Sequence, residues 1–133
     1  MEDIYIKATE KTPEVNIKVD EGYVKIEGRS LPENVRSFYY PLVQDFNKII
    51  EYWKKESELE DFEFHVKLGY FNSSSAKFIL DLLMAFMTIE TEAYKQTKVY
   101  WYYEEEDIDM KEAGMQMADL LNKEFEYIEY TDE

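Results

Sequence analysis

The alternation of apolar and polar residues over residues 62–70 is the clearest structural signal in the chain. Apolar side chains occupy every second position, and between them stand Glu63, His65, Lys67 and Gly69. A period of two is typical of a strand with one buried face and one polar face. After Phe71 the period becomes helical, and the apolar positions of that amphipathic helix are Phe78, Ile79, Leu82, Leu83, Phe86 and Met87.

The same two periods divide the rest of the chain into elements. Short alternating segments predict strands within 4–8, 15–19, 24–28, 98–103 and 125–130. Helical spacing predicts two further helices, within 35–55 and 110–121. Glycine at residue 22 predicts a tight hairpin turn between the second and third strands. The predicted order is three strands, followed three times by a helix and a strand.

This order predicts how the strands pair. Strand-helix-strand crossovers imply a mainly parallel sheet, and the opening hairpin adds an antiparallel edge. Polar residues on alternate positions of the central strand indicate that helices cover only one sheet face. We therefore expect a single α/β domain over residues 1–133, close to the α+β class. It has a mixed sheet of about six strands and three helices mainly on one face.

Composition and charge narrow the classes of function. The 133 residues include 30 acidic and 15 basic side chains, a formal net charge of -15 at pH 7. That charge repels nucleic acid and anionic membranes, so the expected partners are proteins with basic patches. The chain has no cysteine, which excludes disulfides and thiolate metal sites. It has no apolar run of membrane-spanning length and no basic start, so we expect a cytoplasmic protein.

Aromatic residues are unusually frequent. They make up 17% of the chain, with 12 tyrosines and 8 phenylalanines. The predicted core does not accommodate all of them. An exposed aromatic patch for self-association therefore remains open.

Asn72, Ser73, Ser74 and Ser75 lie between the central strand and the next helix. Backbone N–H groups at a helix N-terminus lack intrahelical partners, and the helix dipole favours negative charge there. One interpretation is that these residues only cap the helix. A cap uses one or two side chains, however, so at least one serine hydroxyl is spare. A spare hydroxyl at this position is a good phosphate acceptor, which is the second interpretation.

Catalytic interpretations have less support from the residues. A nucleophilic serine needs a neighbouring base, and the single histidine, His65, is expected to be a solvated strand residue that does not reach the serines. Carboxylates gather at 104–109, but without EF-hand spacing, so Asp107 is expected to cap the next helix. An enzyme that uses Asn72 and the serines beside this acidic loop remains an alternative, since both segments follow strands at one sheet edge.

Four segments, in this order, are similar to those of a known family. They are Thr12 to Glu14, Gly28 to Asn34, Tyr70 to Lys77, and Trp101 to Glu105 together with Glu112 to Gly114. On these segments the chain resembles the SiaC family of bacterial regulatory phosphoproteins, which are similar to STAS-type anti-sigma factor antagonists. The resemblance spans nearly the whole chain and implies one STAS-like domain over residues 1–133.

The resemblance also implies a phosphorylation site. In the family, the phosphorylated residue is a threonine directly after the asparagine of a Tyr-x-Asn-Thr-Ser-Ser motif, and this position is Ser73 here. Serine keeps the acceptor hydroxyl. Ser74, which matches the modified serine of STAS antagonists, is the alternative acceptor, and Ser75 is a third. Asn72, Ser74, Ser75 and Lys77, on the exposed first turn, are expected to contact partners.

The partners implied by the resemblance are proteins. A kinase with a histidine-kinase-like ATPase fold adds the phosphate, a PP2C-type phosphatase removes it, and the unmodified form binds a target. For known members this target is a diguanylate cyclase that controls biofilm behaviour. We therefore expect a partner-switching protein with no catalytic residue, metal or cofactor. The alternatives are a small acidic enzyme and a constitutive scaffold whose serines are only helix caps.

Overall fold

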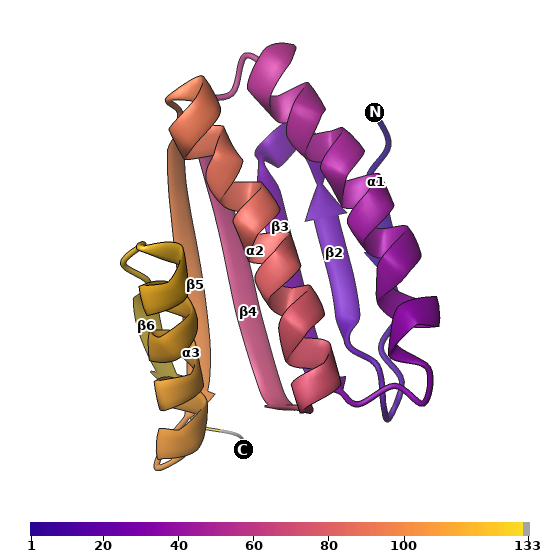
Figure 1. Cartoon of the computed structure of the whole chain (residues 1–133), viewed down its shortest axis with the longest axis vertical. Coiled ribbons are helices and arrows are strands. Elements are labelled where there is room, and N and C mark those ends of the chain that lie inside the picture. Colours follow the sequence, from indigo (N-terminus) through magenta and orange to yellow (C-terminus); the bar gives the residue numbers. More distant parts are fainter. Residues whose placement is uncertain (132–133) are drawn as a thin grey trace.

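The computed structural model describes residues 1–131, which contain six strands, three α-helices and one short 3-10 helix, η1 (Val19–Glu21), between β2 and β3 (Figure 1). The strands are β1 (Ile4–Ile6), β2 (Glu14–Lys18), β3 (Tyr23–Ser30), β4 (Asp61–Phe71), β5 (Gln96–Glu104) and β6 (Glu126–Tyr130). The helices are α1 (Val35–Lys55), α2 (Ser73–Ala93) and α3 (Ile108–Leu121). This is the predicted order of elements. In the described range, no helix has both the length and the apolar character needed to cross a bilayer.

The six strands form one mixed sheet in the order β1-β2-β3-β4-β5-β6. β1, β2 and β3 pair antiparallel, whereas β3, β4, β5 and β6 pair parallel. Each parallel pair is joined by one of the three helices, because a parallel connection needs a crossover. The predicted antiparallel N-terminal hairpin on a mainly parallel sheet is confirmed.

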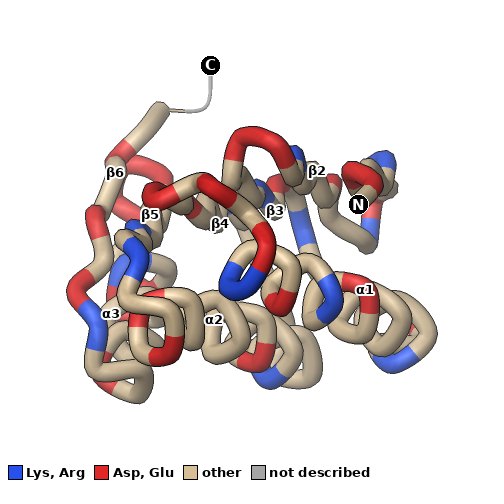
Figure 2. The backbone as a smooth tube through the Cα atoms, turned by 90° about the horizontal axis from the view of Figure 1, so that it is seen from above, with Lys and Arg blue, Asp and Glu red and all other residues tan. Residues whose placement is uncertain are grey.

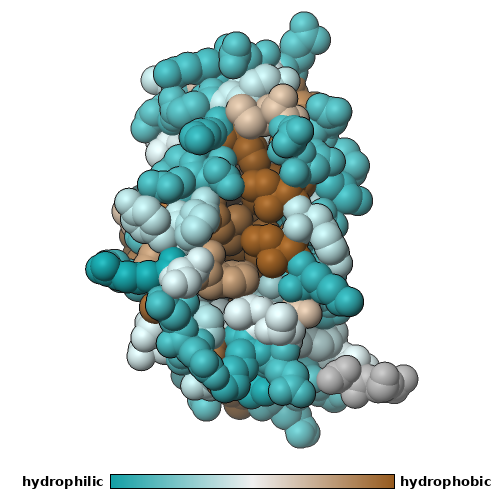
Figure 3. Space-filling view, turned by 90° about the vertical axis from the view of Figure 1, so that its right-hand side faces the viewer, coloured by the Kyte–Doolittle hydropathy of each residue, from teal (hydrophilic) through white to brown (hydrophobic). Residues whose placement is uncertain are grey.

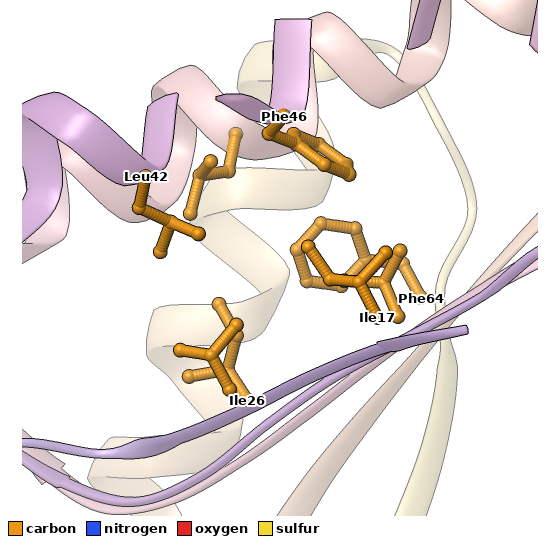
Figure 4. A pocket seen from close by; sticks show the side chains of 8 residues that line it. Ile17, Ile26, Leu42, Phe46 and Phe64 are labelled. Carbon is orange, nitrogen blue, oxygen red and sulfur yellow. The ribbon is translucent and has the colours of Figure 1, made fainter. Parts of the chain in front are cut away.

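All three helices lie on the same side of the sheet, as the view from above shows (Figure 2). Between the helices and the sheet lies the core, where Leu42 and Phe46 of α1 point toward Ile17, Ile26 and Phe64 (Figure 4). The predicted single helical layer is therefore confirmed. The uncovered side of the sheet is called the open face below.

The core comes close to the surface along the edge formed by α1 and the N-terminal strands. Figure 3 shows a strip of apolar side chains there, hollowed between hydrophilic flanks. Ile4 and Ile6 of the edge strand β1 are only partly buried. The core is thus covered more thinly at this edge than between α2 and the central strands.

The hairpin between β2 and β3 requires glycine at residue 22, as the sequence predicts. Gly22 has φ of 64°, the left-handed region that glycine adopts without steric cost. A Cβ at this position would lie 2.8 Å from the Phe62 ring and 2.9 Å from the Asp61 carbonyl oxygen. The turn therefore packs directly against the start of β4.

Candidate functional site

The junction between β4 and α2 is capped by Asn72 alone. The Asn72 side chain accepts a hydrogen bond from the backbone N–H of Ser75 at 2.9 Å. The Asn72 backbone N–H donates to the carbonyl of Ser30 at 3.0 Å, which ties the cap to the end of β3. No serine hydroxyl is needed for the cap, so the hydroxyls of the serine segment are available for other roles.

Ser73 and Ser74 are both exposed, in the first turn of α2. Their backbone N–H groups have no acceptor among the residues that the structure describes. The first turn also contains no acidic side chain that would repel an anion. A phosphate on either hydroxyl would meet free N–H groups and the positive end of the helix dipole.

Ser75 differs from its neighbours, because its side chain is 0% exposed. Its hydroxyl donates to the Ser30 carbonyl at 3.0 Å and accepts from the Ser30 hydroxyl at 2.8 Å. Ser75 lies one helical turn before the buried Ile79 and so shares the core-facing side of α2. The prediction that Ser75 belongs to an exposed partner surface is therefore wrong, and the folded chain does not offer its hydroxyl to a kinase.

Ser30, Tyr39 and Ser75 form a buried hydroxyl cluster that joins β3, α1 and α2. The Tyr39 and Ser30 hydroxyls lie 2.5 Å apart, and both residues are fully buried. The Ser30 hydroxyl uses its single hydrogen to donate to Ser75, so Tyr39 is the donor to Ser30. Burial raises the pKa of Tyr39, which keeps its hydroxyl protonated. The Tyr39 ring also stacks on Phe78 of α2, with centroids 5.4 Å apart. The cluster therefore holds the first turns of both helices at the serine segment.

Sequence reasoning missed this cluster. Ser30 and Ser75 are 45 positions apart in the chain, so no local spacing brings them together. The only signal in the sequence was indirect. Three consecutive serines stand at a helix start, where at most two hydroxyls can cap the helix.

Removing the Tyr39 hydroxyl tests the cluster. Tyr39→Phe leaves the Ser30 hydroxyl without its donor, and we expect a loss of about 1–2 kcal/mol in the free energy of unfolding. Tyr40→Phe is the matched control, because Tyr40 is 59% exposed, and it should stay within about 0.5 kcal/mol of the parent. Urea unfolding followed by tryptophan fluorescence measures both. Equal stability of the two variants would contradict a structural role of the cluster.

His65 lies on the open face, away from the serine segment. Its side chain is only 13% exposed, stacks on Tyr100 at 4.5 Å, and hydrogen-bonds Tyr102 at 2.8 Å and Glu63 at 3.0 Å. The prediction of a solvated histidine is therefore wrong, because neighbouring rings cover it. His65 is also predicted not to act as a base for the serines. Its position agrees with this prediction, because His65 lies on the open face whereas Ser75 faces the helical side of the sheet.

The acidic loop provides a helix cap, and the hollow at its start is lined by no serine. Asp107 caps α3, as predicted, by accepting from the backbone N–H of Met110 at 3.1 Å. Glu104 lines a hollow on the open face at the ends of the parallel strands, with Arg29, Lys67 and Tyr70, but the lining contains no serine. Within residues 1–131, no three histidine, aspartate or glutamate side chains lie close enough together to hold a metal ion.

Comparison with known proteins decides the family. The sequence model of the "SiaC family regulatory phosphoprotein" matches residues 6–130. The chain belongs to the SiaC family. No curated protein sequence matches the chain.

Solved structures of SiaC share the fold of this SiaC family member. Apo-SiaC from Pseudomonas aeruginosa has a TM-score of 0.76 at 18% identity, covering 98% of this chain and 100% of that one. A second structure of SiaC of P. aeruginosa gives 0.77 at 19% identity, covering 99% and 100%. A crystal structure of diguanylate cyclase SiaD in complex with its activator SiaC, also from P. aeruginosa, gives 0.80 at 18% identity, covering 98% and 100%. At this identity, the likeness establishes the fold.

Proposed function

We propose that this SiaC family protein is a binding protein controlled by phosphorylation, with no catalytic activity of its own. Ser73 is the phosphate acceptor, and Ser74 is the alternative. One observation carries the proposal: two exposed serines stand at the N-terminus of α2, although Asn72 already caps the helix. In a constitutive scaffold the serines would serve only as helix caps, but the Asn72 side chain already caps this helix.

The proposed partners follow from family membership. In P. aeruginosa, SiaC is the activator of the diguanylate cyclase SiaD. We propose that this chain also binds a target of this class. Its other proposed partners are a histidine-kinase-like kinase and a PP2C-type phosphatase, and all of them act in the cytoplasm. The docking surface consists of Asn72, Ser73, Ser74 and Lys77; Ser75 is left out because it is buried. A phosphate in this turn adds charge and bulk where the target would dock.

Mass spectrometry of the native protein tests the acceptor. Protein purified from its own cells with phosphatases inhibited is digested, and the peptide containing the serine segment is sequenced. We expect a single phosphate on Ser73. A phosphate on Ser74 would support the switch with Ser74 as the acceptor. A phosphate on Ser75 would contradict the buried hydroxyl cluster. Complete absence of phosphate across growth conditions would count against the switch.

Binding measurements test the direction of control. We expect Ser73→Ala to bind the diguanylate cyclase of the same organism like the unmodified protein. Ser73→Asp should bind it about tenfold or more weakly, since a new charge at the docking turn opposes association. Asn47→Asp is the control for an added negative charge, because Asn47 is an exposed residue of α1 outside the docking turn. Two results together would overturn the proposal. Ser73→Ala and Ser73→Asp would bind the cyclase equally well, and the native protein would carry no phosphate in its own cells.

A further inference from the structure

The pairing of β4 with β5 stops before either strand ends. The last pair in the register is Val66 with Trp101, although β4 continues to Phe71 and β5 to Glu104. Figure 1 shows the two strands diverging toward their C-terminal ends. On the open face, a hollow of about 630 Å³ lies at these strand ends, and all four parallel strands contribute to its lining. A hollow of this size suits a small-molecule ligand, and open α/β sheets bind ligands at the C-terminal ends of their strands.

This hollow is called the strand-end hollow below, and its lining includes Gly28, Arg29, Lys67, Gly69, Tyr70 and Glu104. A β-bulge shapes it. The register passes from Gly28 and Leu68 directly to Arg29 and Tyr70, so Gly69 is an extra residue in β4. The extra residue turns Tyr70 to the face that carries Arg29, whose guanidinium lies 5.9 Å from the centre of the Tyr70 ring. Gly28 and Gly69 add no side chains, so a ligand can approach the backbone between these groups.

Two cations of the lining are available to an anion. Arg29 is exposed, and it has no carboxylate partner within residues 1–131. Lys67 lies 3.7 Å from the Glu27 carboxylate, but Lys25 holds the same carboxylate more closely, at 3.1 Å. A guanidinium with unused donors beside an ammonium group suits a phosphate. Their two positive charges match one phosphate monoester, which carries about two negative charges at pH 7.

Glu104 lies at the other end of the strand-end hollow. It belongs to β5, two strands away from Arg29 on β3, so the two backbones are about 10 Å or more apart. Its side chain has no ion pair or hydrogen bond to any other residue of the described range. A carboxylate without a partner is an acceptor for N–H groups of a ligand. Guanine presents a ring N–H and an amino group side by side on one edge, and a single carboxylate can accept from both.

We propose that the strand-end hollow binds a guanine nucleotide with a single phosphate. The phosphate binds Arg29 and Lys67, the base lies against the tyrosine rings of the lining, and Glu104 accepts from the donor edge of the base. Such a nucleotide carries its phosphate and this edge at opposite ends, as the separation of Arg29 from Glu104 requires. A nucleic-acid strand does not suit the site, because the net charge of -15 repels a polyanion.

The nucleotide site is separate from the proposed phosphorylation switch. Neither Ser73 nor Ser74 belongs to the lining of the hollow, and α2 begins on the helical side of the sheet. The experiments below use the unphosphorylated full chain. The inference therefore stands or falls without the proposed function.

Glycine amide signals test the site by NMR, because the chain has only four glycines. Gly28 and Gly69 line the strand-end hollow, whereas Gly22 lies in the β2–β3 turn and Gly114 in α3. In a titration of the ¹⁵N-labelled chain with guanosine monophosphate (GMP) at about 0.15 M NaCl, the Gly28 and Gly69 signals should shift and saturate below about 1 mM. The other two should stay in place. No shift up to about 10 mM, or equal shifts of all four signals, would overturn the proposal.

Matched substitutions test the two ends of the ligand by calorimetry with GMP and adenosine monophosphate (AMP). We expect GMP to bind at least about fivefold more tightly than AMP, which presents only one amino group on the corresponding edge. Arg29→Gln should weaken both nucleotides about tenfold, whereas Glu104→Gln should weaken GMP alone. The exposed residues Arg36 of α1 and Glu112 of α3 supply the controls. Arg36→Gln and Glu112→Gln should change both affinities less than about twofold.

Two results of this series would refute the inference. Equal affinity of the parent for GMP and AMP would contradict a guanine site. Unchanged GMP binding by Arg29→Gln, in a variant that circular dichroism shows to be folded, would contradict the place of the phosphate.

Discussion

Ser75→Asp is expected to cost roughly 3–5 kcal/mol of folding stability, whereas Ser73→Asp and Ser74→Asp should each stay within about 1 kcal/mol of the parent. Ser75 is fully buried, and its oxygen hydrogen-bonds the carbonyl and the hydroxyl of Ser30. A carboxylate placed there loses its hydration and faces a carbonyl oxygen, which repels it. At the two exposed positions, the same carboxylate lies in water at the positive end of the helix dipole.

Urea unfolding of the three aspartate variants measures this difference. Ser75→Ala completes the set, since it removes the hydroxyl without adding charge and should cost about 1–2 kcal/mol. Similar midpoints for all three aspartate variants would show that Ser75 is accessible in solution. The expected pattern would instead restrict phosphorylation of the folded protein to Ser73 and Ser74.

Gly114→Ala is expected to destabilise the protein by about 2–3 kcal/mol, although alanine normally stabilises a helix interior by about 1 kcal/mol. A Cβ at Gly114 would lie 2.6 Å from three atoms of the Trp101 indole. That indole does not move aside easily, because its N–H donates to the Met110 carbonyl at 2.9 Å and its ring stacks on Phe125. The clash therefore outweighs the helical propensity.

Gly69→Ala is the matched control for Gly114→Ala. A Cβ at Gly69 would lie 3.9 Å from the Gly28 carbonyl oxygen, which is an ordinary van der Waals distance. We expect this variant to unfold within about 0.5 kcal/mol of the parent. Thermal and urea unfolding compare the two. A stable Gly114→Ala variant would mean that α3 shifts away from β5 at little cost.

Much of the fold follows from local pattern. The alternation over 62–70 predicts β4 and its polar face, and the helical spacing after Phe71 predicts α2. The close packing of Gly114 against Trp101, in contrast, depends on how α3 lies on β5. Not every apolar position of α3 is buried, since Leu120 near its C-terminal end is 72% exposed. α3 covers only the β5 side of the sheet, so an apolar position at the end of its stripe remains in solvent.

The candidate site was predicted only in part. The junction, the cap type and the two exposed serines agree with the sequence reading. Ser75 and His65 do not, because burial at both positions comes from residues on other elements: Ser30 and Tyr39 in one case, Tyr23 and Tyr100 in the other. Such contacts leave no periodic trace in the sequence.

The sequence by itself determined the elements, their order and the face that each turns to the core, because these depend on neighbours two to four positions away. It also determined the family, through segments spread along residues 6–130. Only the tertiary structure decided which serines face solvent and that neighbouring rings cover His65. Both depend on side chains that distant strands and helices bring together, and Ser30 reaches Ser75 across 45 positions only once β3 and β4 pair.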